Sequence, residues 1–329
     1  MTNDDRLFRH RDAQPVLGFI GCGEVGSIFG AGLCGREAQR AGWTWDRKFA
    51  DPDAAPGEAP RARDRATAAG LGVCESMADL CARADLLISA VTASNTLAVA
   101  LEAAASLRPG TVFLDLNSAS PAAKQAAAAE IEAAGGRYVE AGVMTSVPPY
   151  GIRVPMLLGG PAAGRLQDTL NAWGMDTRAV AESIGTASAI KMCRSVMIKG
   201  LEALVIESYA TARAYGVEDQ VLPTLAETFP SIDWSRQGAY FFSRVVQHGR
   251  RRAEEMREAA ATVREAGFEP WMSEAIARKQ QWMADQARAG RFEGLGKDAP
   301  WQAYADRLLA ARGTSDGLDS SREPAPDAG

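Results

Sequence analysis

The stretch "GFIGCGEVG" constrains the fold of this chain more than any other. Gly21, Gly23 and Gly26 form a G-x-G-x-x-G pattern directly after an apolar run, residues 16–20, and at the start of a helical stretch. Gly21 allows a tight turn, Gly23 lets a pyrophosphate approach the backbone, and Gly26 lets helix and strand pack closely. The pattern in this context predicts a Rossmann-type β-α-β unit that binds a dinucleotide.

The amides of this turn and the following helix N-terminus are expected to hold the pyrophosphate. Asp46 ends the stretch "GWTWD", about twenty residues after the last glycine of the motif. Its carboxylate is placed to accept hydrogen bonds from an adenosine ribose, although it could also be a solvated residue at a strand end. Arg47 could meet the 2′-phosphate of NADP, but Asp46 would repel that phosphate. The expected cofactor is therefore NAD, with NADP as the alternative.

Short apolar runs alternate with alanine-rich helical stretches from residue 16 to about residue 156. The predicted helices cover residues 25–41, 60–69, 77–82, 97–107 and 121–134. Strands that alternate with helices of this length indicate a doubly wound parallel sheet with helices on both faces. The sequence therefore predicts an α/β fold for this part of the chain.

The strand pattern ends after Gly185, and the rest of the chain is helical in character. A single helix is predicted over 186–215, followed by helices over 220–227, 236–266, 274–289 and 301–311. We expect disordered tails at 1–13 and 313–329, a Rossmann domain at 14–185, and an all-helical substrate and dimerisation domain at 186–312. A helix of this length suggests a homodimer that buries its remaining surface.

Composition narrows the class of protein. The 329 residues carry a net charge of −5 and only two histidines, and the five cysteines show no C-x-x-C pair. A basic nucleic-acid-binding surface, a disulfide framework and a zinc or His-rich metal site are therefore not expected. No apolar run reaches the roughly 18 residues of a membrane span, and the first dozen residues do not resemble a signal peptide. We expect a cytoplasmic protein that binds neither nucleic acid, membrane nor metal.

The stretch "GTASAIKMCRS" places a lysine among small and apolar residues of the long predicted helix. Lys191, Arg194, Ser195 and Ile198 follow the i, i+3, i+4, i+7 spacing of one helix face. An ammonium, a guanidinium and a hydroxyl on one face can bind a polyoxygenated acid. The alternative is that Lys191 extends toward solvent or pairs with an acid such as Glu202.

Two further stretches lie where strands end: "DLNSASP" at 115–121 and "VEAGVMTS" at 139–146. Together with the glycine turn and the lysine helix, they resemble in order and spacing the β-hydroxyacid dehydrogenases, the family of 3-hydroxyisobutyrate and 6-phosphogluconate dehydrogenases. The resemblance covers about residues 15–290. It implies that Lys191 is the catalytic acid/base, exchanging a proton with the substrate hydroxyl while hydride moves between the adjacent carbon and nicotinamide. Burial lowers the pKa of a lysine from about 10.4 toward roughly 7 or 8, which suits this role.

The chain also departs from the family pattern. Ser195 stands where the family usually has Asn, and Met144, Thr145 and Ser146 replace a Ser-Gly-Gly loop that binds the substrate carboxylate. Backbone amides and two hydroxyls of the changed loop could still bind a carboxylate. By alignment, a Lys-Asp pair of the family falls on Glu254 and Glu255, so the second family lysine is absent here. The nearby "HGRRR", beginning at His248, could supply its positive charge or simply be a solvated helix face. These changes resemble a subgroup with a short helical C-terminal domain of undefined role.

The loops after two predicted strands should border the ligand crevice, with Thr92 and Asn117 near the nicotinamide ribose or amide. The expected cofactor-binding residues are Gly21, Cys22, Gly23, Glu24, Val25, Gly26, Asp46, Arg47, Val91, Thr92 and Asn117. The expected substrate-binding residues are Asn117, Ser118, Met144, Thr145, Ser146, Arg194, Ser195 and His248. The favoured function is an NAD(P)-dependent dehydrogenase of a small 3-hydroxy acid. An imine reductase, whose members tend to lack the lysine, and a non-catalytic dinucleotide sensor are the alternatives.

Overall fold

The computed structural model describes residues 7–8, 14–35, 40–50 and 57–310. Contacts divide the chain into two compact units, Met1–Ser195 with Glu258–Pro270, and Val196–Arg257 with Trp271–Gly329. Apart from residues 7 and 8, the tail predicted at 1–13 lies outside the described residues, as does the one at 313–329. The bounds of the two predicted domains stay a prediction.

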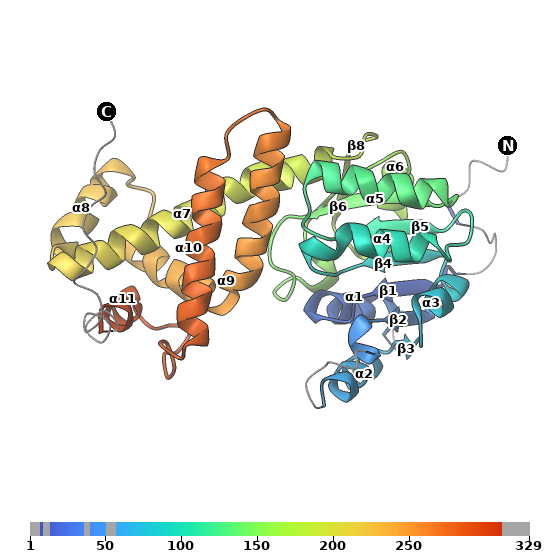
Figure 1. Cartoon of the computed structure of the whole chain (residues 1–329), viewed down its shortest axis with the longest axis horizontal. Helices are drawn as coiled ribbons and strands as arrows, with labels where there is room; N and C mark the ends of the chain where they lie inside the picture. The colour runs from blue at the N-terminus through green and yellow to red at the C-terminus, as the bar shows by residue number, and fades with distance from the viewer. Residues whose placement is uncertain (1–6, 9–13, 36–39, 51–56, 311–329) are drawn as a thin grey trace, which may run out of the picture. The chain divides into compact units, whose positions relative to one another are not determined.

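The first unit contains an eight-stranded sheet with the order β3-β2-β1-β4-β5-β6-β7-β8 (Figure 1). Its strands are β1 Leu17–Ile20, β2 Gly42–Trp45, β3 Gly72–Val73, β4 Leu86–Ser89, β5 Val112–Asp115, β6 Arg137–Val143, β7 Met156–Gly159 and β8 Thr177–Ala181. Among these strands every neighbouring pair is parallel except β6 and β7. The Rossmann-type α/β fold class is therefore confirmed.

Helices cover both faces of this sheet. They are α1 Glu24–Cys34, α2 Glu58–Ala68, α3 Met77–Arg83, α4 Thr96–Ala104, α5 Pro121–Ala133 and α6 Ala163–Ala172. Successive strand residues point to opposite faces, so Leu17 and Phe19 of β1 join the core beneath α1, α2 and α6, while Ile20 joins the core beneath α3, α4 and α5. In Figure 1, α4 and α5 lie side by side on the second of these faces. Burial on both faces explains the continuous apolar character of the strands.

Four elements of the first unit differ from the prediction. Helix α6 and strand β8 were not expected; β8 has the burial pattern Beiii and lies at the edge of the sheet, so its sequence lacks a buried apolar run. Strand β7 runs antiparallel to β6 because the connection between them, residues 144–155, contains no helix longer than the 3-10 turn Gly151–Arg153. Helix α1 was predicted to reach residue 41 but ends at Cys34, where Gly35 donates a hydrogen bond to the carbonyl of Ala31.

The second unit is helical throughout its described residues. Helix α7, Thr186–Tyr215, begins in the first unit and continues into the second, and has the predicted bounds. It is followed by α8 Glu218–Thr228, α9 Trp234–Glu265, α10 Trp271–Arg288 and α11 Trp301–Ala310. Tyr209 and Trp301 pack with ring centroids 4.8 Å apart in the core of this unit. A Cβ at Gly238 would lie 2.5 Å from the Tyr209 ring, so only glycine lets α9 approach α7 this closely.

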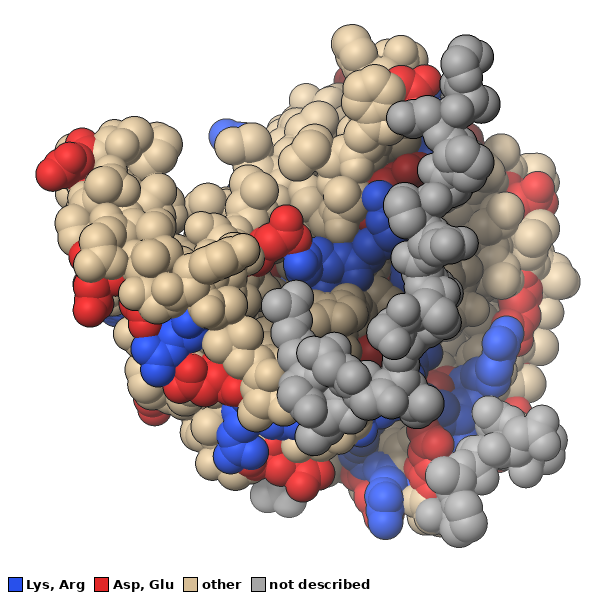
Figure 2. All heavy atoms as spheres, turned by 60° about the vertical axis from the view of Figure 1, so that its left-hand side comes forward, with Lys and Arg blue, Asp and Glu red and all other residues tan. Residues whose placement is uncertain are grey.

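None of the helices in the described part of the chain has the length and apolar character needed to cross a membrane. Basic and acidic side chains are interspersed over the face shown in Figure 2, so neither sign of charge dominates that face.

Candidate active site

The glycine turn after β1 has the geometry that a dinucleotide requires. Gly21 has φ +89°, and a Cβ at Gly26 would overlap the Gly21 carbonyl oxygen. A Cβ at Gly23 would meet no atom within 4 Å, so this residue faces open space. Helix α1 begins at Glu24 without a side-chain cap, and its first-turn amides and dipole favour an anion there. The turn therefore fits a bound pyrophosphate.

Asp46 joins the end of β2 to this turn. One carboxylate oxygen, Oδ2, accepts a hydrogen bond from the backbone nitrogen of Cys22 at 2.7 Å. The other, Oδ1, accepts one from the backbone nitrogen of Lys48 at 3.0 Å and caps the 3-10 turn Arg47–Phe49. A carboxylate has about four lone-pair positions, so these two bonds leave acceptor capacity for ribose hydroxyls. The predicted acid is thus held beside the predicted turn.

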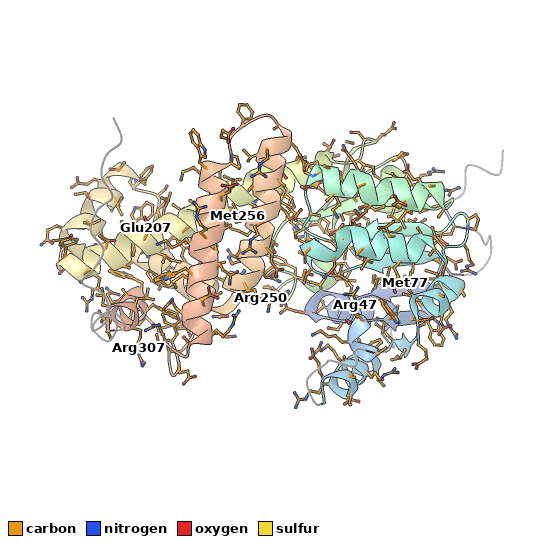
Figure 3. All side chains as sticks on the ribbon, viewed as in Figure 1. Arg47, Met77, Glu207, Arg250, Met256 and Arg307 are labelled. Carbon is orange, nitrogen blue, oxygen red and sulfur yellow. The ribbon has the colours of Figure 1, made fainter. Side chains whose placement is uncertain are left out.

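Arg65 is a residue near this turn that the sequence did not reveal. It lies on α2, and its Nη1 donates to the carbonyl oxygen of Cys22 at 3.2 Å. Arg47, marked in Figure 3, is exposed at the end of β2, and Lys48 beside it pairs with Glu58 at 2.5 Å. No local pattern marks Arg65, because its contact joins residues 43 positions apart. Arg65 therefore lies beside the glycine turn, and Arg47 directly follows Asp46 in the chain.

The ends of β4 and β5 are joined by the side chain of Asn117. Its Oδ1 accepts from the backbone nitrogen of Val91 at 2.7 Å, and its Nδ2 donates to the Ser89 hydroxyl at 3.0 Å. Asn117 is buried, whereas Thr92 is exposed in the adjacent loop. The order of the strands reverses between β1 and β4, and doubly wound sheets bind ligands at this point. The geometry gives Asn117 a positioning role at this edge; direct contact with a ligand stays a prediction.

Lys191 lies near the start of α7 and reaches the loop after β5. Its Nζ donates a hydrogen bond to the Ser118 hydroxyl oxygen at 2.5 Å, and both side chains are partly buried. These two predicted residues are 73 positions apart in the sequence. In the second unit, Glu202 pairs with Arg252, and Gln280 also lies near its carboxylate, so the acid suggested as a partner of the lysine is engaged there.

A buried carboxylate holds the helix that carries this lysine. Glu140 of β6 accepts hydrogen bonds at Oε1 from the backbone nitrogens of Gly185, at 2.7 Å, and Ala187, at 3.0 Å. Its Oε2 accepts from the Ser188 hydroxyl at 2.7 Å and from the Ser188 backbone nitrogen at 3.2 Å. Glu140 has no exposed surface. The carboxylate thus satisfies first-turn donors that would otherwise be unpaired and favours the positive end of the helix dipole.

The backbone of β6 also contacts α7 directly. A Cβ at Gly142 would lie 3.0 Å from the carbonyl oxygen of Ala187 and 3.5 Å from the Cβ of Lys191. The first of these distances is too short for a comfortable contact, and the neighbouring atom belongs to the helix backbone. Glycine at position 142 therefore sets how closely the start of α7 approaches the sheet.

A second buried network supports the loop that carries Ser118. Asp115 ends β5 and accepts hydrogen bonds from the Lys124 ammonium at 2.9 Å and from the Tyr138 hydroxyl at 2.5 Å. It also accepts a hydrogen bond from the backbone nitrogen of Asn117 at 2.8 Å. Burial, reinforced by the charge of Asp115, holds the pKa of Tyr138 well above its usual value, so this phenol remains a donor. The network fixes the end of β5 and was not predicted from the sequence.

Two acids from the end of α9, in the part that belongs to the first unit, contact the start of α5. Glu258 accepts from the backbone nitrogen of Ser120 at 2.8 Å, and Glu265 accepts from that of Ala122 at 3.1 Å. Burial raises the pKa of Glu258, while the Ser120 amide acts in the opposite direction. Alignment to the family drew attention to residues 254 and 255 and missed these two positions.

The remaining predicted substrate residues are placed as follows. Met144, Thr145 and Ser146 directly follow β6, and the backbone nitrogen of Met144 bonds to the carbonyl of Pro155 at 2.9 Å. On α7, Arg194 is exposed and Ser195 is buried. His248 belongs to the second unit and lines a cavity there. Their roles in substrate binding stay predictions.

Comparison with known proteins matches each of the two parts of the chain to a described protein family. Residues 16–163 match the family described as the NAD binding domain of 6-phosphogluconate dehydrogenase. Residues 212–283 match a domain of unknown function, DUF1932.

Solved structures similar to this chain share its fold along most of its length. A conserved hypothetical protein from Sinorhizobium meliloti 1021 is 38% identical, with a TM-score of 0.71, over 91% of this chain and 97% of that one. A conserved protein of unknown function, described as structurally similar to 3-hydroxyacid dehydrogenases, is 30% identical over 83% of this chain and 98% of its own, with a TM-score of 0.63. The 3-hydroxyisobutyrate dehydrogenase of Mycobacterium tuberculosis, solved with L-serine, is 17% identical over 90% and 99%, also with a TM-score of 0.63.

Proposed function

Because the chain belongs to the β-hydroxyacid dehydrogenase family, in a subgroup whose C-terminal part is a DUF1932 domain, we propose that it oxidises or reduces a small 3-hydroxy acid with Lys191 as acid/base. The matched NAD binding domain at residues 16–163 supports NAD(P) as the cofactor. The choice of substrate and the role of the lysine are the parts we propose.

The contact between Lys191 and Ser118 carries this proposal. It lies at the carboxyl edge of β5, where doubly wound sheets bind their ligands. A nicotinamide held at this edge would supply the hydride chemistry at the substrate carbon. Lys191 as a neutral amine takes the proton from the substrate hydroxyl, and as an ammonium returns it in the reverse direction. Ser118, as a hydrogen-bond partner of Nζ, orients the lysine toward that oxygen.

The chain's own residues bind the two ends of the cofactor differently. In our proposal the turn at 21–26 and the first turn of α1 hold the pyrophosphate, and Asp46 holds the adenosine ribose. Asp46 favours NAD by repelling a 2′-phosphate, whereas Arg47 and Arg65 would attract one. We propose NAD as the preferred form, with the two arginines as the residues that permit NADP.

The carboxylate of the substrate is assigned to the loop after β6 and to one face of α7. The amides and hydroxyls of Thr145 and Ser146 are donors, and Arg194 and Ser195 follow Lys191 at i+3 and i+4 on the helix. Met144 would add apolar contact at the entrance of this loop. A substrate that carries its carboxylate one carbon away from the hydroxyl-bearing carbon suits this arrangement of donors around an amine.

The test is a substrate panel read by nicotinamide absorbance. Purified protein is incubated with NAD or NADP and a series of 3-hydroxy acids, with 2-hydroxy acids and simple alcohols as controls. We expect turnover with 3-hydroxy acids above both control series. Cofactor binding without turnover of any acid in the panel would argue for a dinucleotide sensor instead.

A second candidate is an imine reductase, because the same fold occurs in one from Myxococcus stipitatus, 18% identical with a TM-score of 0.50. An arm of the panel with cyclic imines and NADPH separates the two functions. Reduction of imines without turnover of hydroxy acids would favour this second candidate. Lys191 would then have no substrate hydroxyl with which to exchange a proton.

We also propose that the chain is a homodimer. Met197 is 73% exposed and Leu204 57% exposed on α7, and Trp271 is 73% exposed at the start of α10. Apolar side chains at these exposures in a long helix and its neighbour favour a partner surface. Sedimentation velocity should then give twice the mass of the chain.

A further inference from the structure

Lys124 of α5 and Asp115 at the end of β5 form an ion pair that is enclosed by the protein. The Nζ of Lys124 lies 2.9 Å from Oδ1 of Asp115, and their side chains are 0% and 1% exposed. Taking two charges out of water carries a large desolvation cost, and apolar residues of similar volume are often at least as stable in such a place. Stability alone is therefore a weak reason for this pair to stand here.

The three oxygens of Asp115 join α5, β6 and the loop that follows β5. Its carbonyl oxygen accepts a second hydrogen bond from Lys124 Nζ, at 2.9 Å. Its Oδ2 accepts from the hydroxyl of Tyr138 on β6 at 2.5 Å, and its Oδ1 accepts from the backbone nitrogen of Asn117 at 2.8 Å. The direction in which the loop leaves the sheet is therefore fixed from two neighbouring elements.

The ring of Tyr138 is held independently of its hydroxyl. It stacks on Phe113 with ring centroids 5.8 Å apart, and Tyr138 is 1% exposed. Because burial and the charge of Asp115 hold the pKa of Tyr138 well above its usual value, the hydroxyl keeps its proton and stays a donor. Removal of this hydroxyl alone would thus take one donor from Asp115 and leave the aromatic packing in place.

The loop carries the constraint on to the candidate site. The side chain of Asn117 is bonded to the backbone nitrogen of Val91 and to the hydroxyl of Ser89, at the end of the next strand. The next residue is Ser118, whose hydroxyl accepts the hydrogen bond from Lys191 Nζ. The position of that hydroxyl depends on a main chain that Asp115 holds directly before it.

The other end of the loop is tied to the same lysine. The backbone nitrogen of Ser120 donates to Glu258 at 2.8 Å, and the carbonyl oxygen of Ser120 accepts from the backbone nitrogen of Lys124 at 3.0 Å. Lys124 therefore contacts Ser120 through its backbone and Asp115 through its ammonium. Residues 116–119 lie between these two fixed points.

We propose that Lys124 and Tyr138 are positioning residues for the reaction, which act through Asp115 to place the Ser118 hydroxyl against the Lys191 amine. The inference rests on the proposed function, because it takes Lys191 as the acid/base. Both side chains are enclosed, so they act on the loop rather than on a ligand. Displacement of a reacting group by about 1 Å can cost roughly a hundredfold in rate, so a network beneath the loop can control turnover.

Tyr138→Phe tests the proposal by kinetics. With the 3-hydroxy acid of the panel that is turned over fastest, we expect kcat to fall about tenfold while the Kd of NADH stays unchanged. Tyr209→Phe is the matched control, since it removes a buried hydroxyl that donates to the carbonyl of Trp234 at 3.0 Å in the second unit. Urea unfolding confirms that each variant is folded under the assay conditions. The control should lose stability and keep its kcat.

The rate at which acetic anhydride acetylates Lys191 gives a second measurement, made without cofactor or substrate. Exposed Lys297 supplies the reference rate in the same sample. We expect faster acetylation of Lys191 in Tyr138→Phe, by up to about tenfold, because its ammonium loses a fixed acceptor, and the parent rate in Tyr209→Phe. If the parent turns over no hydroxy acid, the proposed function fails, and acetylation still decides whether the network places Ser118 against Lys191.

A double variant, Asp115→Asn with Lys124→Met, replaces Tyr138→Phe should that variant fail to fold. It removes both buried charges together, which avoids an unpaired carboxylate, and it keeps only a neutral acceptor for the Asn117 amide. We expect the same fall in kcat and the same rise in acetylation. A folded variant that acetylates Lys191 at the parent rate, or that keeps the parent kcat, would overturn the proposal.

Discussion

The ammonium nitrogen of Lys191 lies 2.5 Å from the hydroxyl oxygen of Ser118, so a helix that begins after the last strand reaches the end of β5. The contact joins a group that can exchange a proton to a group that can orient it. It also lies at the same sheet edge as the glycine turn. The predictions below follow from this arrangement and from the groups that hold it in place.

Replacing Lys191 with alanine should lower turnover of the best substrate by about 10²- to 10⁴-fold, the usual contribution of a general acid or base. Affinity for NADH should be nearly unchanged, because the predicted cofactor contacts lie on other elements. Steady-state kinetics and a fluorescence titration with NADH measure the two quantities. Lys297→Ala, which removes an exposed lysine of the second unit, serves as the control. Full activity of Lys191→Ala would remove this residue from the mechanism.

Asp46 and Arg65 should act on cofactor choice in opposite directions. Asp46→Ala is expected to weaken NADH binding by roughly tenfold and to favour NADPH, since it removes a ribose acceptor and a negative charge. Arg65→Gln should weaken NADPH binding more than NADH binding. Dissociation constants for both cofactors, measured with each variant, test this. An unchanged ratio in both variants would mean that neither residue lies at the adenosine ribose.

Glu140→Gln should destabilise the protein by about 1–3 kcal/mol, because an amide cannot replace a buried carboxylate that accepts several N–H and O–H donors. We also expect lower turnover with retained cofactor affinity, since the start of α7 carries Lys191. Urea unfolding and steady-state kinetics measure these effects. Glu130→Gln, an exposed acid on α5, provides the matched control. Should Glu140→Gln lose stability and keep its turnover, the carboxylate would be structural and would not position the lysine.

His248 should make the protein sensitive to acid. Burial, together with the charges of Arg244, Arg251 and Arg252, lowers its pKa from an ordinary 6.5 to about 4 in the folded protein, so between these values the unfolded chain binds more protons than the folded one. The contribution of His248 to the free energy of unfolding is therefore fully present above pH 6.5, and it is lost as the pH falls toward 4. His248→Asn should show a smaller loss of the free energy of unfolding between pH 7.5 and pH 5 than the parent. His10→Asn should retain the full loss, and an equal loss in both variants would contradict the assignment.

Much of the fold could be predicted because its signals are local. The glycine spacing at 21–26 lies inside one turn, and α7 runs from Thr186 to Tyr215 without a proline, so its bounds follow from the sequence alone. Strand β8 could not be recognised, because an edge strand with a half-exposed pattern resembles a loop. The reversal of β7 depends on the path of residues 144–155, which no periodicity encodes.

In the candidate site, too, local motifs could be predicted from the sequence, whereas long-range contacts could not. Lys191 and Ser118 were predicted by motifs, but their contact depends on how β6 supports α7. Glu140 lies within "RYVEAGV", where it reads as an ordinary polar residue of a strand, and only the tertiary structure identifies it as a helix cap. Arg65 and Glu258 reach their partners across 43 and 138 positions, distances at which single-sequence patterns carry no information.

The absence of a side chain at Gly142 has a consequence for how this chain can change its specificity. At Gly142 the main chain of β6 packs against the main chain of α7, which carries Lys191. The distance between the sheet and the Lys191 amine therefore cannot be adjusted by repacking apolar side chains. New substrates would have to be accommodated by substitutions at exposed positions around the lysine, such as Thr145 and Arg194. The reactive nitrogen would keep its place while the shape of the space around it evolved.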